Sequence, residues 1–293
     1  MVDEPERPGR STPVGVVRCE GDALREGRDD VATEEPLEIR LRAGGRSASL
    51  AVTMRTPGND LELAAGFLFS EGIAGPERIA GIAYCLDPEL TAEQRYNVVT
   101  VDLHAPELPD LAALERHFLT SSACGVCGRA SLDALRERGV APLADGLRVE
   151  IATLYALPGR MRAQQRVFAE TGGLHAAALF DARGVLLALR EDVGRHNALD
   201  KLIGWGVLEG RGFAGTLLAV SGRTSYEIVQ KAASAGIPVV CGISAPSSLA
   251  VRLADEFGIT LAGFLRGERC NLYAHPQRVL AQPPGGGGVS GRT

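Results

Sequence analysis

The chain has 293 residues, of which 45% are hydrophobic and 23% charged, and its formal net charge is −5. This composition indicates a soluble globular protein with a sizeable core, in one large domain or two smaller ones, and the negative charge argues against a general nucleic-acid binder. The first residues lack the apolar core of a signal peptide, and no apolar run reaches membrane-spanning length. We therefore expect a cytoplasmic protein without a membrane partner.

Composition divides the chain into five segments. Both ends are rich in proline, with charged residues or glycine, which is typical of chain without a packing role. The expected segments are a disordered lead at 1–14, an N-terminal α+β region at 15–117, a mobile loop with two cysteines at 118–130, an α/β core at 131–280 and a flexible tail at 281–293.

The N-terminal region is expected to combine strands with one helix. Alternating hydrophobic residues predict the strands, and the helix follows residues that favour a helix start. The elements in chain order are strands at 37–41 and 48–52 around a turn at Gly44–Gly45, a helix that is capped by Asn59–Asp60 and ends at Gly72, and a strand at 97–103. The apolar face of the helix is expected to contain Leu61, Ala64, Ala65 and Leu68.

The second half alternates strands and helices. The elements are a hairpin of strands at 174–180 and 185–189 around 181–184, a helix at 195–208, a strand at 216–220, a helix at 224–235, a strand at 237–241, a helix at 246–257 and a strand at 259–263. This alternation predicts an α/β layered sheet that is largely parallel in this half.

Two cysteines, Cys124 and Cys127, lie in a stretch of small residues at 121–128. The glycines and serines there favour a mobile, exposed loop, which suits sulfur chemistry better than packing. The pair fits half of a zinc site, a thioredoxin-like redox pair, a persulfide carrier whose second thiol helps to release the sulfur, or exposed thiols without a role. Arg129 either favours the thiolate or is an ordinary solvated charge. The other four cysteines are scattered singly, so they form no disulfide scaffold and no second zinc pair.

Three polar turns follow successive strands. Arg195 and His196 begin one helix, Arg223 and Ser225 lie at the start of the next, and 244–248 spans the start of the third. Helix N-termini offer unpaired N–H groups to anions, and arginine adds charge. Each turn alone also fits plain helix capping, but together, at the carboxyl edge of an open sheet, they indicate one nucleotide-sized pocket.

Two further features are candidates for this pocket. Arg266 and Arg269 flank a glycine beside Phe264, so they can grip phosphates and stack on a base, or form a solvated turn. His175 begins a strand, a place more typical of a hydrogen-bonded structural histidine than of a catalytic one.

These motifs together resemble the FdhD family of formate dehydrogenase accessory sulfurtransferases. The resemblance covers residues 15–280 and is carried by RTPGNDLELAAGFLFSEGI, ACGVCG, TGGLHAAAL, EDVGRHNALDKLIG, SGRTSYEIVQKA, SAPSSLAV and GFLRGERCNLYAHP, in that order. A set of long, ordered motifs is far more specific than the cysteine pair alone.

The resemblance implies a sulfur carrier. Such proteins take sulfur from a cysteine desulfurase, hold it as a cysteine persulfide, and deliver it to the molybdenum cofactor of formate dehydrogenase, a bis-molybdopterin guanine dinucleotide bound as substrate. It also implies a sheet layered as in cytidine deaminase, with helices on both faces, and a homodimer.

The resemblance assigns roles to particular residues. Cys124 is the implied persulfide carrier and Cys127 its assisting partner, and no metal site is expected. The stretch implied to bind the guanine dinucleotide is Phe264, Leu265, Arg266, Gly267, Glu268 and Arg269. The polar turns that complete the pocket contribute Arg195, His196, Arg223 and Ser225.

Three alternatives stay open at this point. A cofactor-insertion chaperone would need the arginines but not the cysteines, whereas a dithiol redox protein would need no guanine nucleotide. A zinc deaminase would need the H-x-E and P-C-x-x-C signature. Here His175 is followed by two alanines, and the cysteine pair comes earlier in the chain, so we expect at most the fold of a deaminase.

Overall fold

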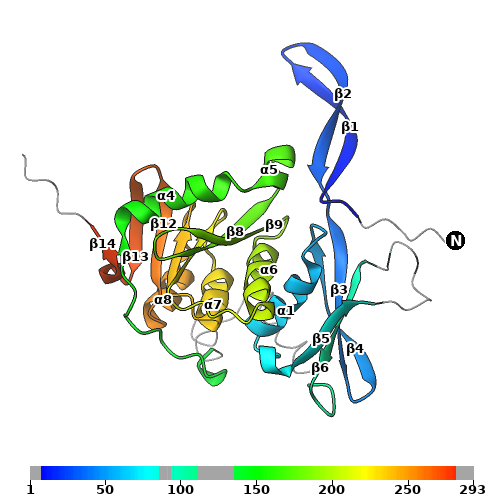
Figure 1. Cartoon of the computed structure of the whole chain (residues 1–293). Helices are drawn as coiled ribbons and strands as arrows, with labels where there is room; N and C mark the ends of the chain where they lie inside the picture. Colours follow the sequence, from blue (N-terminus) through cyan, green and yellow to red (C-terminus); the bar gives the residue numbers. More distant parts are fainter. Residues whose placement is uncertain (1–7, 86–90, 92–93, 95, 111–134, 282–293) are drawn as a thin grey trace, which may run out of the picture.

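The structure is a computed structural model, and it describes residues 8–85, 91, 94, 96–110 and 135–281. Figure 1 shows two regions packed side by side, each with its own sheet, and a long hairpin that projects near the place where they meet. The hairpin consists of β1 (Ser11–Glu20) and β2 (Ala23–Ala32). Residues 11–14 are therefore strand, which corrects the expectation that the disordered lead extends to residue 14.

The N-terminal region is a four-stranded sheet of order β4-β3-β6-β5, covered on one face by α1. Its elements are β3 (Glu35–Ala43), β4 (Arg46–Arg55), α1 (Asp60–Ser70), the 3-10 turn η1 (Pro76–Arg78), β5 (Ile79–Tyr84) and β6 (Val98–Leu103). The predicted turn is confirmed, because Gly44 and Gly45 have φ of 55° and 75°, the left-handed conformation that a tight hairpin requires. β5 was not predicted.

The start of α1 differs from the expectation. Asn59 has φ of 60°, and its side chain accepts a hydrogen bond from Arg10 (2.6 Å) instead of capping the helix. The buried face includes the predicted Ala64, Ala65 and Leu68, but Leu63 takes the place of Leu61, which is half-buried.

The core is a six-stranded sheet of order β13-β12-β11-β10-β8-β9. Its strands are β8 (His175–Asp181), β9 (Leu186–Asp192), β10 (Thr216–Val220), β11 (Val239–Gly242), β12 (Thr260–Arg266) and β13 (Arg269–Ala274). The predicted hairpin and the next three strands are confirmed. Only the pairs β10–β11 and β11–β12 are parallel, so the sheet is mixed and not largely parallel. The missed strand β13 and the antiparallel β8–β9 hairpin account for the difference.

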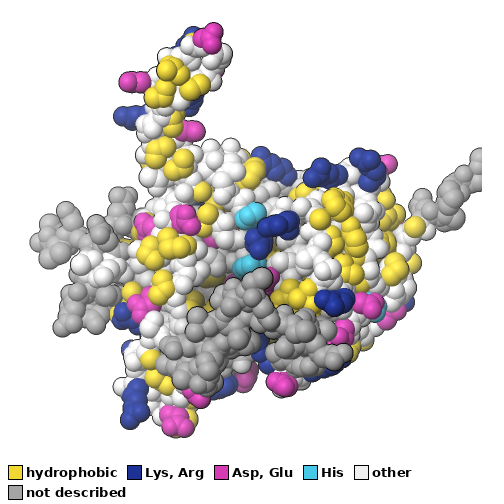
Figure 2. Space-filling view, turned by 180° about the vertical axis from the view of Figure 1, so that it is seen from behind, with side chains coloured by type: hydrophobic (Ala, Val, Ile, Leu, Met, Phe, Trp, Pro, Cys, Tyr) yellow, Lys and Arg dark blue, Asp and Glu magenta, His cyan; other side chains and the backbone are white. Residues whose placement is uncertain are grey.

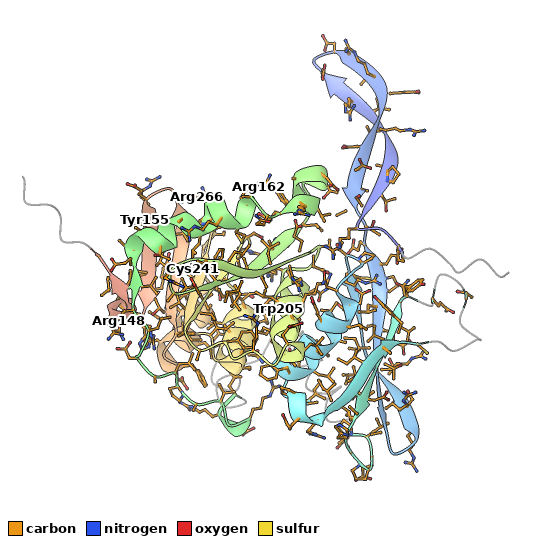
Figure 3. The ribbon with its side chains drawn as sticks, in the orientation of Figure 1. Arg148, Tyr155, Arg162, Trp205, Cys241 and Arg266 are labelled. Atoms are coloured by element: carbon orange, nitrogen blue, oxygen red, sulfur yellow. The ribbon has the colours of Figure 1, made fainter. Side chains whose placement is uncertain are left out.

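Helices cover both faces of this sheet, as expected. One face carries the predicted helices α6 (Arg195–Leu208), α7 (Tyr226–Ala235) and α8 (Ser248–Glu256), and the other carries α4 (Ile151–Arg162). Figure 3 shows Tyr155 and Arg162 along α4, with Cys241 in the sheet below it. The remaining elements are β7 (Val149–Glu150), α5 (Arg166–Thr171), the 3-10 turn η2 (Pro276–Arg278) and β14 (Val279–Leu280). The likeness to cytidine deaminase stays a prediction.

The two regions meet where α1 crosses α6. A side chain at Gly66 would overlap the backbone carbonyl of Asp200, and one at Gly204 would overlap the carbonyl of Glu62. The same joint is bridged by Arg190, whose guanidinium contacts Glu62 through two nitrogens (2.5 and 2.7 Å). Within the part of the chain that the structure describes, no helix is both long and apolar enough to cross a membrane.

Candidate functional site

The carboxyl edge of the six-stranded sheet gathers the predicted polar turns. Because β10, β11 and β12 run in the same direction, the segments that follow them emerge at one edge. Backbone hydrogen bonds tie these segments together, from Thr224 N to Ala245 O (3.2 Å) and from Phe264 N to Ser244 O (3.1 Å). β8 runs in the opposite direction, so its first residue, His175, lies at this edge opposite Asp192.

His175 and Arg195 pack across Gly222. A Cβ atom at Gly222 would lie 3.2 Å from His175 Nδ1, closer than ordinary van der Waals contact, and 3.7 Å from Arg195 Cδ, so both side chains border this glycine. Burial lowers the pKa of His175, and Arg195 lowers it further, although Asp192 acts in the other direction. His175 is therefore a neutral imidazole at pH 7.

His196 joins the same cluster from the first turn of α6. Its Nε2 lies 3.4 Å from Ser225 Oγ and 3.8 Å from Glu227 Oε2. Burial and then Arg195 lower the pKa of His196 to about 4, against the opposing effect of Glu227. The edge thus presents two neutral imidazoles beside an arginine.

Arginine side chains at this edge are available to an anion. Arg195 Nε is buried and has no hydrogen-bond partner among the described residues, and Arg223 is exposed. In the described structure, α6 has no side-chain hydrogen bond at its N-cap, so its first N–H groups keep their capacity for a ligand. In α7 the Glu227 carboxylate accepts a hydrogen bond from its own backbone N–H, so part of that helix start is already occupied. Figure 2 shows histidine and basic side chains side by side near the middle of this face. The chemistry offered is that of a phosphate site.

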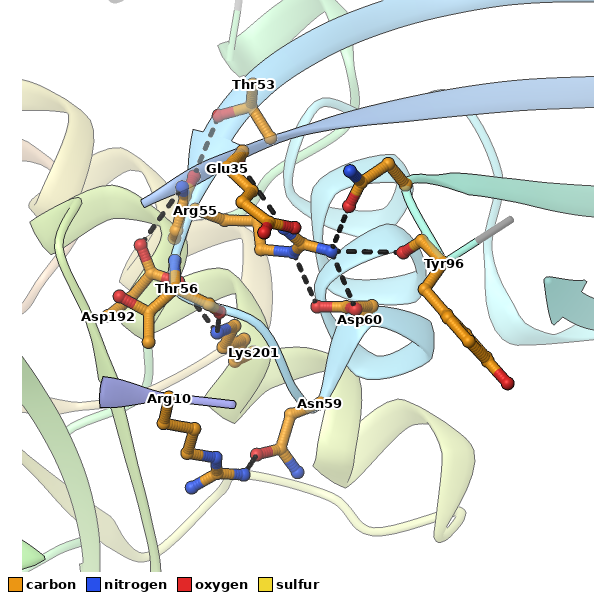
Figure 4. Close-up of polar contacts among 12 residues, drawn as sticks. Arg10, Glu35, Thr53, Arg55, Thr56, Asn59, Asp60, Tyr96, Asp192 and Lys201 are labelled. Atoms are coloured by element: carbon orange, nitrogen blue, oxygen red, sulfur yellow. Dashed lines mark hydrogen bonds and ion pairs between the residues drawn. The ribbon is translucent and has the colours of Figure 1, made fainter. Parts of the chain in front are cut away.

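A buried ionic network fixes the start of α6 (Figure 4). Lys201 Nζ lies 2.7 Å from Asp192 Oδ2, with both side chains almost fully buried. Lys201 also donates to Thr56 O (2.7 Å), and Thr56 N donates to Asp192 (3.1 Å). The loop before α1 is therefore fastened to the turn that carries Arg195.

Asn197 extends this attachment toward β4. Its Nδ2 donates to Met54 O (2.7 Å) and to Asp192 Oδ1 (3.2 Å), while Thr53 Oγ1 donates to its Oδ1 (3.3 Å). One residue beyond Met54, the buried Arg55 pairs with Asp60 at the first turn of α1. The N-terminal region thus forms the rigid support of the site.

A second buried network lies behind His196. Lys231 on α7 is 3.0 Å from Asp200 on α6 and 3.0 Å from Glu71 at the end of α1. Burial lowers the pKa of Lys231, but Asp200 and Glu71 outweigh it and hold the pKa above its ordinary value. Lys231 is therefore a fixed positive charge that joins three helices.

The structure separates the members of the predicted stretch at 264–269. Phe264 is 44% exposed at the sheet edge and has φ of 54°, a strained conformation for a large residue. Leu265 is buried in the core under α4, so its side chain packs and does not face a ligand. Arg266, Gly267, Glu268 and Arg269 form the exposed tip of the β12–β13 hairpin. Their role in binding stays a prediction.

Cys124, Cys127 and Arg129 lie outside the described residues, so the roles assigned to them stay predictions. The described cysteines are all free thiols. Burial raises the pKa of Cys241 to about 12 and also raises that of Cys270, so neither forms a thiolate easily. Among the described residues, no cluster of His, Cys, Asp and Glu is suited to a metal ion.

Sequence reasoning missed Thr56, Lys201 and Glu227. All three lie within the motifs that carry the resemblance, but a lysine inside a helix and a threonine in a loop are ordinary surface residues by pattern alone. The roles of Thr56 and Lys201 depend on contacts between segments more than 130 residues apart, as the hydrogen bond from Thr56 to Asp192 shows with its separation of 136. Glu227 contacts His196, which lies much nearer in the chain but on a different helix.

The similarity of this chain to known proteins extends over both regions. A model described as the FdhD/NarQ family matches residues 32–280. A sulfur carrier protein FdhD of Streptomyces avermitilis is 51% identical over 270 residues, covering 90% of this chain and 94% of that protein. Another, of Mycobacterium tuberculosis, is 48% identical over 257 residues, covering 86% and 92%. A crystal structure assigned as a formate dehydrogenase accessory protein, from Desulfotalea psychrophila, matches with a TM-score of 0.71 and 28% identity, covering 92% of this chain and 99% of that chain.

Proposed function

The chain belongs to the FdhD/NarQ family, and on that premise we propose that it carries persulfide sulfur from a cysteine desulfurase to the molybdenum cofactor of formate dehydrogenase. The names of its relatives, sulfur carrier protein and formate dehydrogenase accessory protein, support the carrier role and this recipient. The proposed substrate is the bis-molybdopterin guanine dinucleotide form of the cofactor. The proposed working unit is a cytoplasmic homodimer.

The observation that carries this proposal is the phosphate-type chemistry of the sheet edge. The uncapped start of α6, with Arg195 and the exposed Arg223, suits the diphosphate of a guanine dinucleotide. His175 and His196 are held neutral, so they act as hydrogen-bond partners without adding charge. Phe264, exposed and strained beside these turns, is suited to stack on the base.

The sulfur step conserves atoms and electrons. The Cys124 thiolate attacks the terminal sulfur of the desulfurase persulfide, a new S–S bond forms, the donor S–S bond breaks, and the desulfurase cysteine leaves as a thiolate. For delivery, the Cys127 thiolate attacks Cys124 Sγ, so that a disulfide forms and hydrosulfide leaves toward the metal. A thiol reductant must then restore the two thiols before the next cycle.

The first test is intact-protein mass spectrometry after incubation with a cysteine desulfurase and cysteine. Wild type and Cys127→Ala should gain one sulfur atom that dithiothreitol removes, and Cys124→Ala should gain none. Cys19→Ala is the matched control, because Cys19 is an exposed thiol outside the proposed chemistry. A gain that persists in Cys124→Ala would refute the assigned carrier residue. No gain in any variant would favour a cofactor chaperone without sulfur transfer.

The nucleotide half of the proposal is tested separately by calorimetric titration with GDP. Arg223→Ala should weaken GDP binding about tenfold or more through loss of a charge-assisted contact with phosphate. The exposed Arg183→Ala serves as the control, because Arg183 lies in the β8–β9 turn at the opposite edge of the sheet. Equal affinity in both variants would remove Arg223 from the pocket.

A further inference from the structure

The β1–β2 hairpin, hereafter the arm, projects from the rest of the molecule and contacts α5 near its base (Figures 1 and 2). Its strands pair along their whole length, from Ser11 opposite Ala32 to Glu20 opposite Ala23, and within the described structure neither strand joins another sheet. The arm ends where the family match begins, at residue 32. An isolated two-stranded hairpin is only marginally stable in water, so a structure that covers it is expected.

The arm exposes large hydrophobic side chains, which is more typical of an interface than of a solvated loop. Val17, Leu24 and Val31 are 59%, 71% and 41% exposed. Figure 2 shows hydrophobic side chains along the arm, with charged ones between them. The outer edge of a strand also carries backbone groups ready to pair with another strand.

The charge pattern of β2 identifies the partner. Residues 25–29 read Arg, Glu, Gly, Arg, Asp, and the same run in reverse carries the opposite charge at every charged position. When two copies of β2 lie antiparallel with Gly27 opposite Gly27, Arg25 faces Asp29 and Glu26 faces Arg28. A two-fold axis repeats both pairs. Directly opposite charges of unlike sign stabilise antiparallel strands.

The geometry of the arm permits this pairing. Side chains alternate along a strand, so Arg25 and Asp29 share one face of the ribbon while Glu26 and Arg28 share the other. The carbonyl of Arg28 accepts a hydrogen bond from the exposed Arg18 side chain (2.6 Å), which reaches across Gly27. A backbone N–H of a second copy can replace this flexible donor.

We propose that the arm is the surface through which two copies of this chain associate, joining β2 to β2 in a four-stranded antiparallel ribbon centred on Gly27. This inference rests on the proposed function only in naming the surface of its homodimer. The ribbon is smaller than a standard interface, so association is expected at micromolar concentrations and to weaken as salt rises.

Sedimentation velocity of the full chain tests the proposal with two edge variants. Arg25→Glu/Arg28→Glu makes the edge wholly acidic, and Glu26→Arg/Asp29→Arg makes it wholly basic. Each variant alone should associate at least tenfold more weakly than wild type, because like charges then face each other. An equimolar mixture of the two should recover a dimer, because every facing pair is again of unlike charge.

The matched control is Arg46→Glu/Arg252→Glu, which changes net charge by the same amount as Arg25→Glu/Arg28→Glu, at exposed sites away from the arm. It should associate as wild type does. A monomeric wild type at all concentrations, or edge variants that associate as tightly as wild type, would overturn the proposal. Sulfur uptake by Cys124, measured in the same variants, separates the two questions: loss of uptake without loss of association counts against the proposed function and not against the arm.

Discussion

The sheet edge and the arm use the same kinds of charged side chain in opposite ways. At the edge, Asp192 and Lys201 are almost fully buried and hold two distant segments together within one chain. On the arm, Arg25 and Asp29 are exposed and contribute little to the chain that carries them. The comparison teaches that burial decides what a charged side chain does. A buried ion pair fixes the structure of its own chain, whereas an exposed charged side chain is free to pair with another molecule.

The largest loss of folding stability is expected where α1 and α6 pack with no space between their backbones. Gly66→Val would drive a side chain into the carbonyl of Asp200 and separate α1 from α6, at a cost of about 4 kcal/mol or more in the free energy of unfolding. The same substitution on the arm, Gly15→Val, meets open space and should change stability by less than about 0.5 kcal/mol. Urea unfolding of both variants measures the difference. Similar midpoints would show that the joint can relax.

The next largest effect concerns the buried ion pair. Lys201→Met leaves Asp192 buried without its cation, which should cost about 3–5 kcal/mol. Arg25→Met on the arm is the exposed counterpart and should cost less than about 0.5 kcal/mol. Adding Asp192→Asn to Lys201→Met should restore part of the loss, because the stranded charge is removed. If the double variant is no more stable than the single one, the cost comes from packing and not from charge.

The smallest expected effect is a pH dependence of folding stability, which arises from His196 at the sheet edge and has no counterpart on the arm. The pKa of His196 is lowered to about 4 in the folded chain, from an ordinary value near 6.5, so the unfolded chain binds the additional proton. The contribution of the neutral His196 to the free energy of unfolding is therefore fully present above pH 6.5, and it is lost as the pH falls from 6.5 toward 4. The loss should be about 1 kcal/mol, since the side chain is one-third exposed.

Chemical denaturation of wild type and His196→Gln between pH 7 and pH 4.5 measures this contribution. The variant should lose less stability across the range than wild type does. The arm has no histidine, so Arg25→Met should follow the wild-type slope. Parallel curves for wild type and His196→Gln would contradict the lowered pKa.

Sequence pattern predicted the elements that are mostly apolar and have turn residues at their ends. The helix at 195–208 and the strand at 216–220 were predicted with the bounds that the structure shows, because glycines flank both segments and most of each segment is buried. β1 and β2 gave no such signal, since most of their side chains are exposed and no face is sorted by polarity. In α4, Pro158 and Gly159 hid the helical spacing of Leu154, Leu157 and Met161.

The candidate site was predictable only in outline. Polar residues after successive strands indicated where the turns meet, because strand direction alone brings them to one edge. The attachment of Thr56 to Asp192 was not predictable, since it depends on how two distant regions pack. The strain at Phe264 has the same origin, because the bulge between β12 and β13 is set by pairing and not by local sequence.

The close approach of α1 and α6 also sets how this molecule moves. The backbones of α1 and α6 meet at Gly66 and Gly204 with no side chain between them. We therefore expect that neither region unfolds separately and that the two regions unfold together. Amide hydrogens in α6 should therefore exchange with solvent only through global unfolding, while those of the arm exchange by local fraying. The sheet edge is in this sense rigid before any ligand arrives, and the arm is the part of the chain left to adapt to a partner.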